Sequence, residues 1–156
     1  TENCSTKTIN HEVKESWEAY FEINDNTPVF IEYLVKLQKV LDEYIKDFPW
    51  CNEFAPWSAV SSTNLQYYPP GGGFKQWHCE RGAKVEPVGS RHLVFMTYLN
   101  DVDIGGGTEF FHQKITTPAK KGLTVIWPAD WTHVHRGIAA PKEEKYIITG
   151  WLNYLQ

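Results

Sequence analysis

Beyond Trp50 the chain is a series of short β-prone segments separated by clusters of glycine and proline, and this pattern restricts the fold most strongly. The two most glycine-rich clusters occupy residues 69–73 and 105–107. Runs rich in β-branched and aromatic residues favour strands, and the clusters between them favour tight turns. Many short strands joined by tight turns are typical of a sandwich or small barrel of the jelly-roll type. The predicted strands are 62–68, 93–99, 108–111, 123–127 and 146–152.

One amphipathic helix is predicted before these strands. Apolar residues recur every three or four positions from Phe30 to Phe48, while lysine and acidic residues occupy the other face. Thr27 suits the N-cap and Pro28 suits the first helical position. The pattern ends near Pro49. We expect this helix to pack against the predicted sheet.

A second, short helix is predicted near the N-terminus, because Val13, Trp17, Tyr20 and Phe21 recur at helical spacing. The whole pattern indicates an α+β fold dominated by β-structure. Its core would be a jelly roll, or double-stranded β-helix, at about residues 55–155, with helical support at about residues 10–48. The chain has 156 residues and shows no internal repeat or linker, so one domain spanning residues 1–156 is expected.

Composition argues against several classes of partner. The net charge is −4 and no basic stripe is present, which disfavours nucleic acid as the main partner. No apolar run approaches the length of a membrane span and the first residues carry no signal-peptide pattern, so no membrane partner is expected. Cys4, Cys51 and Cys79 form no paired motif, and an odd number of cysteines gives no disulfide framework. A reducing, cytoplasmic location is therefore predicted.

Three residues have the chemistry of a metal site. His78 and Glu80 lie two positions apart, so on a strand their side chains share one face. A distant histidine, His135, would add a second imidazole. Two imidazoles and one carboxylate on one side of a metal, with open positions left over, are the ligands of non-haem iron(II) oxygenases. A histidine and an acid at this spacing also occur as a simple hydrogen-bonded pair, and the glycine-rich turn before His78 favours the metal site.

The C-terminal strand carries a second element of this site. Lys145 lies in an otherwise apolar strand pattern, where a lysine is costly unless a carboxylate neutralises it. We interpret it as the counter-charge for an acidic cosubstrate, and a solvent-facing strand residue is the alternative. Thr149 and Trp151 follow on the same face. The choice of histidine stays open from the residues alone, because His133 and His135 would share one face of an extended segment.

Four segments between Tyr68 and Trp151 strengthen this interpretation by their order and spacing. They are Tyr68–Gly73, which leads into the first metal ligand, Arg91–Asn100, which ends in Tyr-Leu-Asn, Gly106–Phe110 and Gly122–Pro128. In this order they resemble the iron(II)/2-oxoglutarate-dependent dioxygenases, specifically the prolyl 4-hydroxylase-like branch. Ten positions separate His135 from Lys145, which is the interval of that family, and His133 does not fit it.

The resemblance implies an activity and a role for each residue. The protein would be an Fe(II)- and 2-oxoglutarate-dependent oxygenase that uses O2, hydroxylates an unactivated C–H bond and releases succinate and CO2. The substrate would be a peptidyl proline, or otherwise a small amino acid. The iron ligands would be His78, Glu80 and His135. The residues around 2-oxoglutarate would be Lys145, Thr149, Tyr98 and Tyr68, and those facing the substrate would be Arg91 and Trp151.

One departure from the family keeps other functions in view. The family usually has aspartate where this chain has Glu80, whose side chain is one methylene longer. A degenerate jelly-roll module that binds a metal or a peptide is therefore one alternative. A cupin-type metalloenzyme that does not use 2-oxoglutarate is another, and a solvent-facing Lys145 would favour it. A lysine at position 145 disfavours the nucleic-acid dealkylases of the superfamily, because those enzymes have an arginine there.

Overall fold

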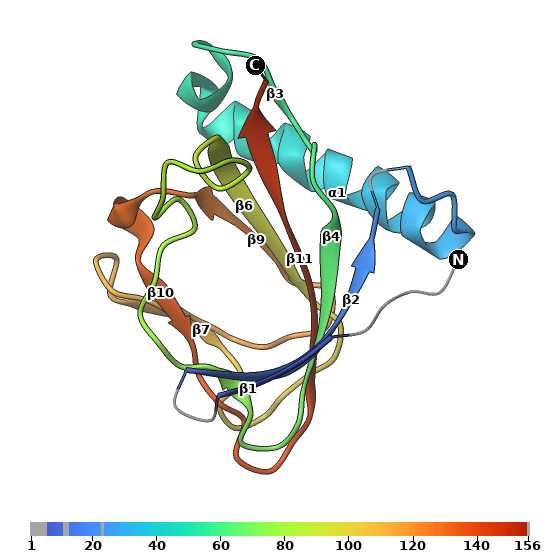
Figure 1. The fold of residues 1–156 in the computed structure, drawn as a ribbon, viewed down its shortest axis with the longest axis vertical. Helices are drawn as coiled ribbons and strands as arrows, with labels where there is room; N and C mark the ends of the chain where they lie inside the picture. Colours follow the sequence, from blue (N-terminus) through green and yellow to red (C-terminus); the bar gives the residue numbers. More distant parts are fainter. Residues whose placement is uncertain (1–5, 11–12, 23, 156) are drawn as a thin grey trace.

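Two antiparallel β-sheets and one long helix make up the described part of the chain, which in this computed structural model is residues 6–10, 13–22 and 24–155 (Figure 1). The larger sheet has the order β1 (Thr6–Asn10), β2 (Lys14–Phe21), β4 (Thr63–Tyr68), β11 (Lys145–Tyr154), β6 (Arg91–Tyr98) and β9 (Thr124–Pro128). Short strands β3 (Trp57–Ser58) and β5 (Gly73–Phe74) pair with β11 and β2. The smaller sheet has the order β10 (His135–Gly137), β7 (Thr108–Phe110) and β8 (Ile115–Thr117).

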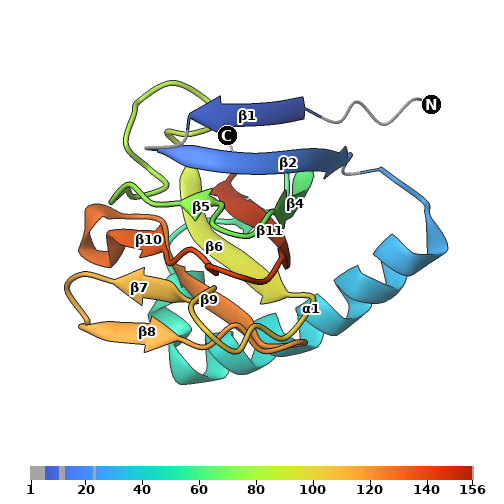
Figure 2. The ribbon, with the colours of Figure 1, turned by 90° about the horizontal axis from the view of Figure 1, so that it is seen from below.

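The larger sheet curls so that one of its faces lies towards the smaller sheet and the other lies against the helix (Figure 2). Strand β6 shows why, because alternate side chains of a strand point to opposite faces. Leu93 and Phe95 pack in the cluster that includes helix α1 (Pro28–Asp47), and Val94 and Met96 pack in the cluster that includes Phe110 of the smaller sheet. This two-layer arrangement confirms the predicted β-dominated jelly-roll fold.

The predicted long helix is confirmed as α1. It starts at Pro28, with Thr27 at the N-cap, and ends at Asp47, just before the short 3₁₀ turn η1 (Pro49–Asn52). The Thr27 side chain makes no capping hydrogen bond, and instead its backbone N–H donates to Asp25 Oδ1 at 2.8 Å. The buried face contains Phe30, Leu37 and Leu41, so the apolar stripe packs into the core as expected.

The prediction of a short N-terminal helix is wrong, because Trp17, Tyr20 and Phe21 lie on β2 and Val13 directly precedes this strand. This strand pairs with β1 on one side and β4 on the other. Its alternation is reversed relative to an ordinary half-buried strand: Ser16 and Glu18 are buried, whereas Trp17 is 43% exposed. The helical spacing of the apolar residues was therefore misleading, because the residues that β2 buries are polar. The predicted helical support at about residues 10–48 is helical only from Pro28.

Two further observations concern the cysteines and the length of the helices. Cys51 and Cys79 are free thiols, and Cys4 lies outside the described residues. Within the described ranges, no helix is both long enough and apolar enough to cross a membrane.

Close packing between β6 and β11 predicts a strong effect of adding one methyl group. A Cβ atom at Gly150 would lie 2.4 Å from Cζ of the Phe95 ring, which is itself 1% exposed. Overpacking of this kind costs about 1–3 kcal/mol. We expect Gly150→Ala to lower the free energy of unfolding by about that amount in a urea titration. The double variant Gly150→Ala/Phe95→Leu should lose less free energy of unfolding than the sum of the losses in the two single variants. A loss equal to that sum would contradict the proposed clash.

Candidate metal and cosubstrate site

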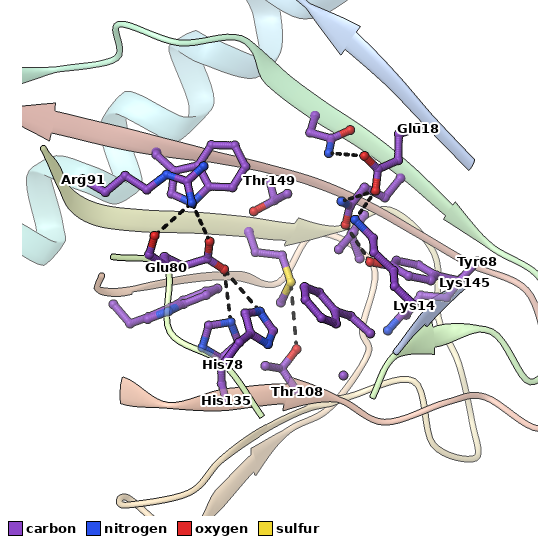
Figure 3. A pocket seen from close by; sticks show the side chains of 18 of the residues that line it. Lys14, Glu18, Tyr68, His78, Glu80, Arg91, Thr108, His135, Lys145 and Thr149 are labelled. Atoms are coloured by element: carbon purple, nitrogen blue, oxygen red, sulfur yellow. Dashed lines mark hydrogen bonds and ion pairs between the residues drawn. The ribbon is translucent and has the colours of Figure 1, made fainter. Parts of the chain in front are cut away.

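A pocket of about 350 Å³ lies between the two sheets. Its walls come from β2, β4, β5, β6, β9 and β11 of the larger sheet, from β7 and β10 of the smaller sheet, and from the segment after β5. Figure 3 shows two groups of side chains in this pocket: His78, Glu80 and His135 gather at one end, and Tyr68, Lys145 and Lys14 lie at the other. The first group has the donors of a metal site and the second carries positive charge.

The structure brings the three predicted metal ligands together. An antiparallel bridge joins the backbones of His78 and His135, with N–H···O distances of 3.0 and 2.9 Å. Glu80 Oε1 lies 3.5 Å from His78 Nε2 and 3.3 Å from His135 Nε2. The ligand atoms of all three lie within 4.8 Å of one another. His133 belongs to the 3₁₀ turn η2 (Trp131–His133) and is not part of this group.

Backbone carbonyls orient both imidazoles towards a common point. The Nδ1 atom of His78 lies 2.8 Å from the carbonyl oxygen of Gln76, and that of His135 lies 2.9 Å from the carbonyl oxygen of His133. A carbonyl oxygen only accepts, so in each ring Nδ1 carries a hydrogen, and Nε2 is the nitrogen that faces Glu80 and would supply its lone pair to a metal ion. This is the usual outer contact of a metal-binding histidine.

Glu80 uses its two oxygens differently. Oε1 faces the two histidines, whereas Oε2 accepts hydrogen bonds from Trp151 Nε1 at 2.9 Å and Arg91 Nη1 at 3.2 Å. The Arg91 guanidinium also stacks on the Trp151 ring, 3.8 Å from its centroid. Burial raises the pKa of Glu80, but hydrogen bonds from His135 and His78 outweigh it and hold that pKa well below its usual range. The longer side chain thus still presents one ionised oxygen to the site.

This donor set fits an iron(II) ion. Two imidazole nitrogens and one carboxylate oxygen are the donors that would hold such an ion from one side and leave its other side to the pocket. Trp127 gives a further sign that the pocket takes a ligand, because its indole Nε1 is buried and donates to none of the described residues. The ring of Trp127 lies edge-on to His135, with centroids 5.0 Å apart.

Lys145 carries the charge at the opposite end of the pocket. It is 3% exposed, donates to the carbonyl oxygen of Gly106 at 3.0 Å and lies over the Tyr68 ring, 4.7 Å from its centroid. None of the described carboxylates pairs with it, and burial alone lowers its pKa to about 8. The ammonium therefore lies at the wall of the pocket without a described carboxylate at ion-pair distance, which is the arrangement expected for binding an anionic ligand.

The lowered pKa of Lys145 predicts how cosubstrate binding depends on pH. Below pH 8 the side chain is an ammonium that attracts a carboxylate, and above its pKa of about 8 it becomes neutral. We expect the Kd for 2-oxoglutarate to rise about tenfold per pH unit above that value. Fluorescence titration of the Zn(II)-loaded protein between about pH 7 and pH 9.5 measures this. Lys145→Arg keeps its charge over this range and should give a flat profile, whereas a slope in that variant would assign the effect to another group.

The other predicted cosubstrate residues lie at different depths. Tyr68 is buried in the pocket wall, and its hydroxyl donates to Gln66 Oε1 at 2.7 Å. Thr149 also lines the pocket and donates to the carbonyl oxygen of Phe95. The Tyr98 hydroxyl is held between Thr108 and Thr117 at 2.8 and 2.9 Å, and this residue does not line the pocket. A contact of Tyr98 with the cosubstrate stays a prediction.

Arg91 and Trp151 lie at the metal end of the pocket, where their polar groups contact Glu80. Their contact with a substrate also stays a prediction. Sequence reasoning missed a whole wall of the pocket, formed by Lys14 and Glu18 of β2 with Asn64 and Gln66 of β4. The alternating polar residues of β2 were the available signal, and the helical spacing of its aromatic residues concealed it.

Comparison with known proteins agrees with this site. The model of the 2OG-Fe(II) oxygenase superfamily matches residues 63–153, which is more than half of the chain. No curated protein sequence matches the chain. Solved structures share its fold at low sequence identity. A viral collagen prolyl hydroxylase from Paramecium Bursaria Chlorella virus-1, in complex with 2OG, is 19% identical with a TM-score of 0.71, covering 92% of this chain and 81% of that one.

Two further structures extend the comparison. A prolyl-4-hydroxylase from Pseudomonas putida is 15% identical, has a TM-score of 0.72 and covers 97% of this chain and 78% of that one. A prolyl hydroxylase from Trichoplax adhaerens, in complex with a hypoxia inducible factor peptide fragment, is 16% identical with a TM-score of 0.73, covering 96% of this chain and 70% of that one. These likenesses establish a shared fold. The family match and the site together identify the chain as a member of the 2OG-Fe(II) oxygenase superfamily, a 2-oxoglutarate-dependent dioxygenase that uses Fe(II) and O2.

Proposed function

We propose that this dioxygenase hydroxylates a proline residue within a peptide and releases succinate and CO2. The observation that carries the proposal is the pocket itself, which combines a His–Glu–His group with a buried lysine that lacks a carboxylate partner among the described residues. The fold of prolyl hydroxylases, one of them in complex with a peptide, supports proline as the target.

The residues of the chain would divide the work between binding and orientation. His78, Glu80 and His135 would hold Fe(II), which supplies the oxidising chemistry when it is bound together with 2-oxoglutarate and O2. Lys145 would pair with the far carboxylate of 2-oxoglutarate and so set the depth at which the cosubstrate binds. Trp151 lies beside Glu80, where its ring would form one side of the space left for the substrate.

The orientation of Glu80 is the second contribution of the protein. Arg91 and Trp151 occupy its outer oxygen, so Oε1, which faces the two histidines, is the oxygen that would bind the metal. A carboxylate that binds through one oxygen leaves more positions open than one that binds through two. This arrangement keeps room for the cosubstrate despite the extra methylene of Glu80.

Succinate release tests the proposed reaction. The Fe(II)-loaded protein is given 2-oxoglutarate, ascorbate and the peptide Ac-Ala-Ala-Pro-Ala-Ala-NH2, a control peptide with alanine in place of proline, or free proline. We expect the proline peptide to stimulate succinate release and to gain the mass of one oxygen atom, and the other two to give only the background. Equal stimulation by free proline would point to a small amino acid as substrate, and no stimulation by any proline peptide would reject the proposal.

A further inference from the structure

One wall of the pocket is a buried polar cluster centred on Glu18, which lies outside the segment that matches the family. Glu18 is 6% exposed and accepts hydrogen bonds from Tyr20 at 2.7 Å and from Ser16 at 3.1 Å. Lys14, four residues earlier on β2, forms an ion pair with Oε1. Figure 3 shows Glu18 and Lys14 at the same side of the pocket as Tyr68 and Lys145.

Glu18 also receives two side-chain amides from the neighbouring strand β4. Asn64 Nδ2 lies 3.1 Å from Oε2, and Gln66 Nε2 lies 3.1 Å from Oε1. Burial raises the pKa of Glu18, but its hydrogen bonds with Lys14 and Tyr20 outweigh burial, and the net effect is a lowered pKa. The carboxylate is therefore ionised and only accepts hydrogen bonds. Each amide must therefore turn its NH₂ group to Glu18 and its carbonyl oxygen away from it.

Of the two amide oxygens, only that of Gln66 has a hydrogen-bond donor among the described residues. Gln66 Oε1 accepts the hydroxyl hydrogen of Tyr68 at 2.7 Å. Asn64 Oδ1 is buried, and no donor among the described residues reaches it, although Asn64 is only 4% exposed and lines the pocket. A buried acceptor without a donor is unfavourable until a ligand or a water supplies one. The cluster thus holds one acceptor without a donor in the wall of the pocket.

The position of Asn64 relates this acceptor to the rest of the site. Asn64 lies directly opposite Thr149 in the β4–β11 register, as Tyr68 lies opposite Lys145. Trp151 is the next residue on the same face of β11 in the direction away from Lys145, and it contacts Glu80. The free acceptor therefore lies alongside the part of β11 that runs from the cosubstrate end to the metal end.

We propose that Asn64 Oδ1 is a substrate subsite that accepts a backbone amide N–H from the peptide, with Glu18 as the residue that positions it. The proposal rests on the proposed peptide hydroxylation and adds a recognition element to it. A proline in a peptide has no N–H, so the donor belongs to a neighbouring residue of the substrate. A neutral N–H is the fitting donor, because Glu18 is already surrounded by five donor groups that include the Lys14 ammonium and offers no free carboxylate to a cation.

A methylation scan of the peptide tests this subsite by binding rather than turnover. Calorimetry measures binding to the Zn(II)- and 2-oxoglutarate-loaded protein, which cannot consume the peptide. The probes are Ac-Ala-Ala-Pro-Ala-Ala-NH2 and the same peptide with each backbone amide N-methylated in turn. In the wild type, methylation at one position should weaken binding about tenfold more than at the others. Asn64→Leu should weaken the parent peptide by a similar factor and remove the sensitivity to that position.

Controls separate recognition from folding. Tyr67→Phe alters a residue three positions after Asn64 on β4, whose ring contacts Tyr146 on the other face, and should keep the sensitivity. Asn64→Ala provides a second variant, and 2-oxoglutarate binding verifies that each variant is folded. Glu18→Gln frees the Asn64 amide to rotate and should reduce the discrimination without removing the acceptor.

The outcomes distinguish this inference from the proposed reaction. Position-specific sensitivity in the wild type that disappears in Asn64→Leu supports the subsite, whether or not succinate is released. Uniform effects of methylation, sensitivity that persists in Asn64→Leu, or binding of none of the peptides overturns it. Succinate release measured on the same peptides reports on the proposed reaction separately, so peptides that are hydroxylated without position-specific sensitivity reject the subsite alone.

Discussion

Alanine in place of Lys145 is expected to raise the KM for 2-oxoglutarate by about one to two orders of magnitude, with a smaller effect on kcat at saturating cosubstrate. The Lys145 ammonium is buried and has no protein carboxylate among the described residues, so its pairing with the cosubstrate is not offset by the loss of an internal ion pair. A charge-assisted hydrogen bond of this kind contributes about 1.5–3 kcal/mol, which is about ten- to 150-fold in affinity. Steady-state kinetics with varied 2-oxoglutarate measures the change.

The matched control for this prediction is Lys142→Ala. Lys142 lies three positions earlier and is exposed, so the variant removes the same charge from the chain without touching the pocket. Its KM should equal that of the wild type. An unchanged KM in Lys145→Ala would contradict the assignment of Lys145 as the counter-charge and would favour a metalloenzyme that does not use 2-oxoglutarate.

The second large effect is expected for His135→Ala, which should weaken metal binding by at least about 100-fold and abolish turnover. His135 supplies one of only three protein ligand atoms, and even the loss of an outer hydrogen-bond partner of a ligand costs about 10–100-fold in metal affinity. Titration with Co(II), followed by its visible absorption, measures binding without any need for activity.

His133→Ala is the informative comparison for this variant. The His133 side chain contacts Thr132 and lies outside the metal group, although its backbone carbonyl orients His135. Alanine keeps that carbonyl, so Co(II) affinity should stay within a few-fold of the wild type. The opposite ranking, with loss of binding in His133→Ala and retention in His135→Ala, would contradict the ligand assignment.

The sequence predicts those elements in which the repeat of apolar residues coincides with the residues that are buried in the structure. Helix α1 has its apolar residues on the face that packs under β6, so periodicity located it correctly. The histidine and glutamate of the metal group were identifiable because His78 and Glu80 lie close together in the chain. His135 was identifiable mainly from its distance to Lys145, because residue type and face do not distinguish it from His133.

The sequence fails where a polar side chain is buried by distant partners. Glu18 is buried on β2 because Asn64 and Gln66, 46 and 48 positions away, donate to it. No local sequence pattern shows that these distant donors satisfy Glu18. The exposed Trp17 beside it fits the spacing of an apolar helix face, which led to the wrong prediction. The contact of Trp151 with Glu80 spans 71 positions and was hidden for the same reason.

An anaerobic titration of the Fe(II)-loaded protein with 2-oxoglutarate tests most directly whether the metal and the cosubstrate share this pocket. A 2-oxo acid chelated to Fe(II) gives a weak visible charge-transfer band. We expect this band to appear in the wild type, to be absent in His135→Ala, and in Lys145→Ala to require a far higher concentration of 2-oxoglutarate. Tight Fe(II) binding with no such band at any concentration of 2-oxoglutarate would contradict this expectation.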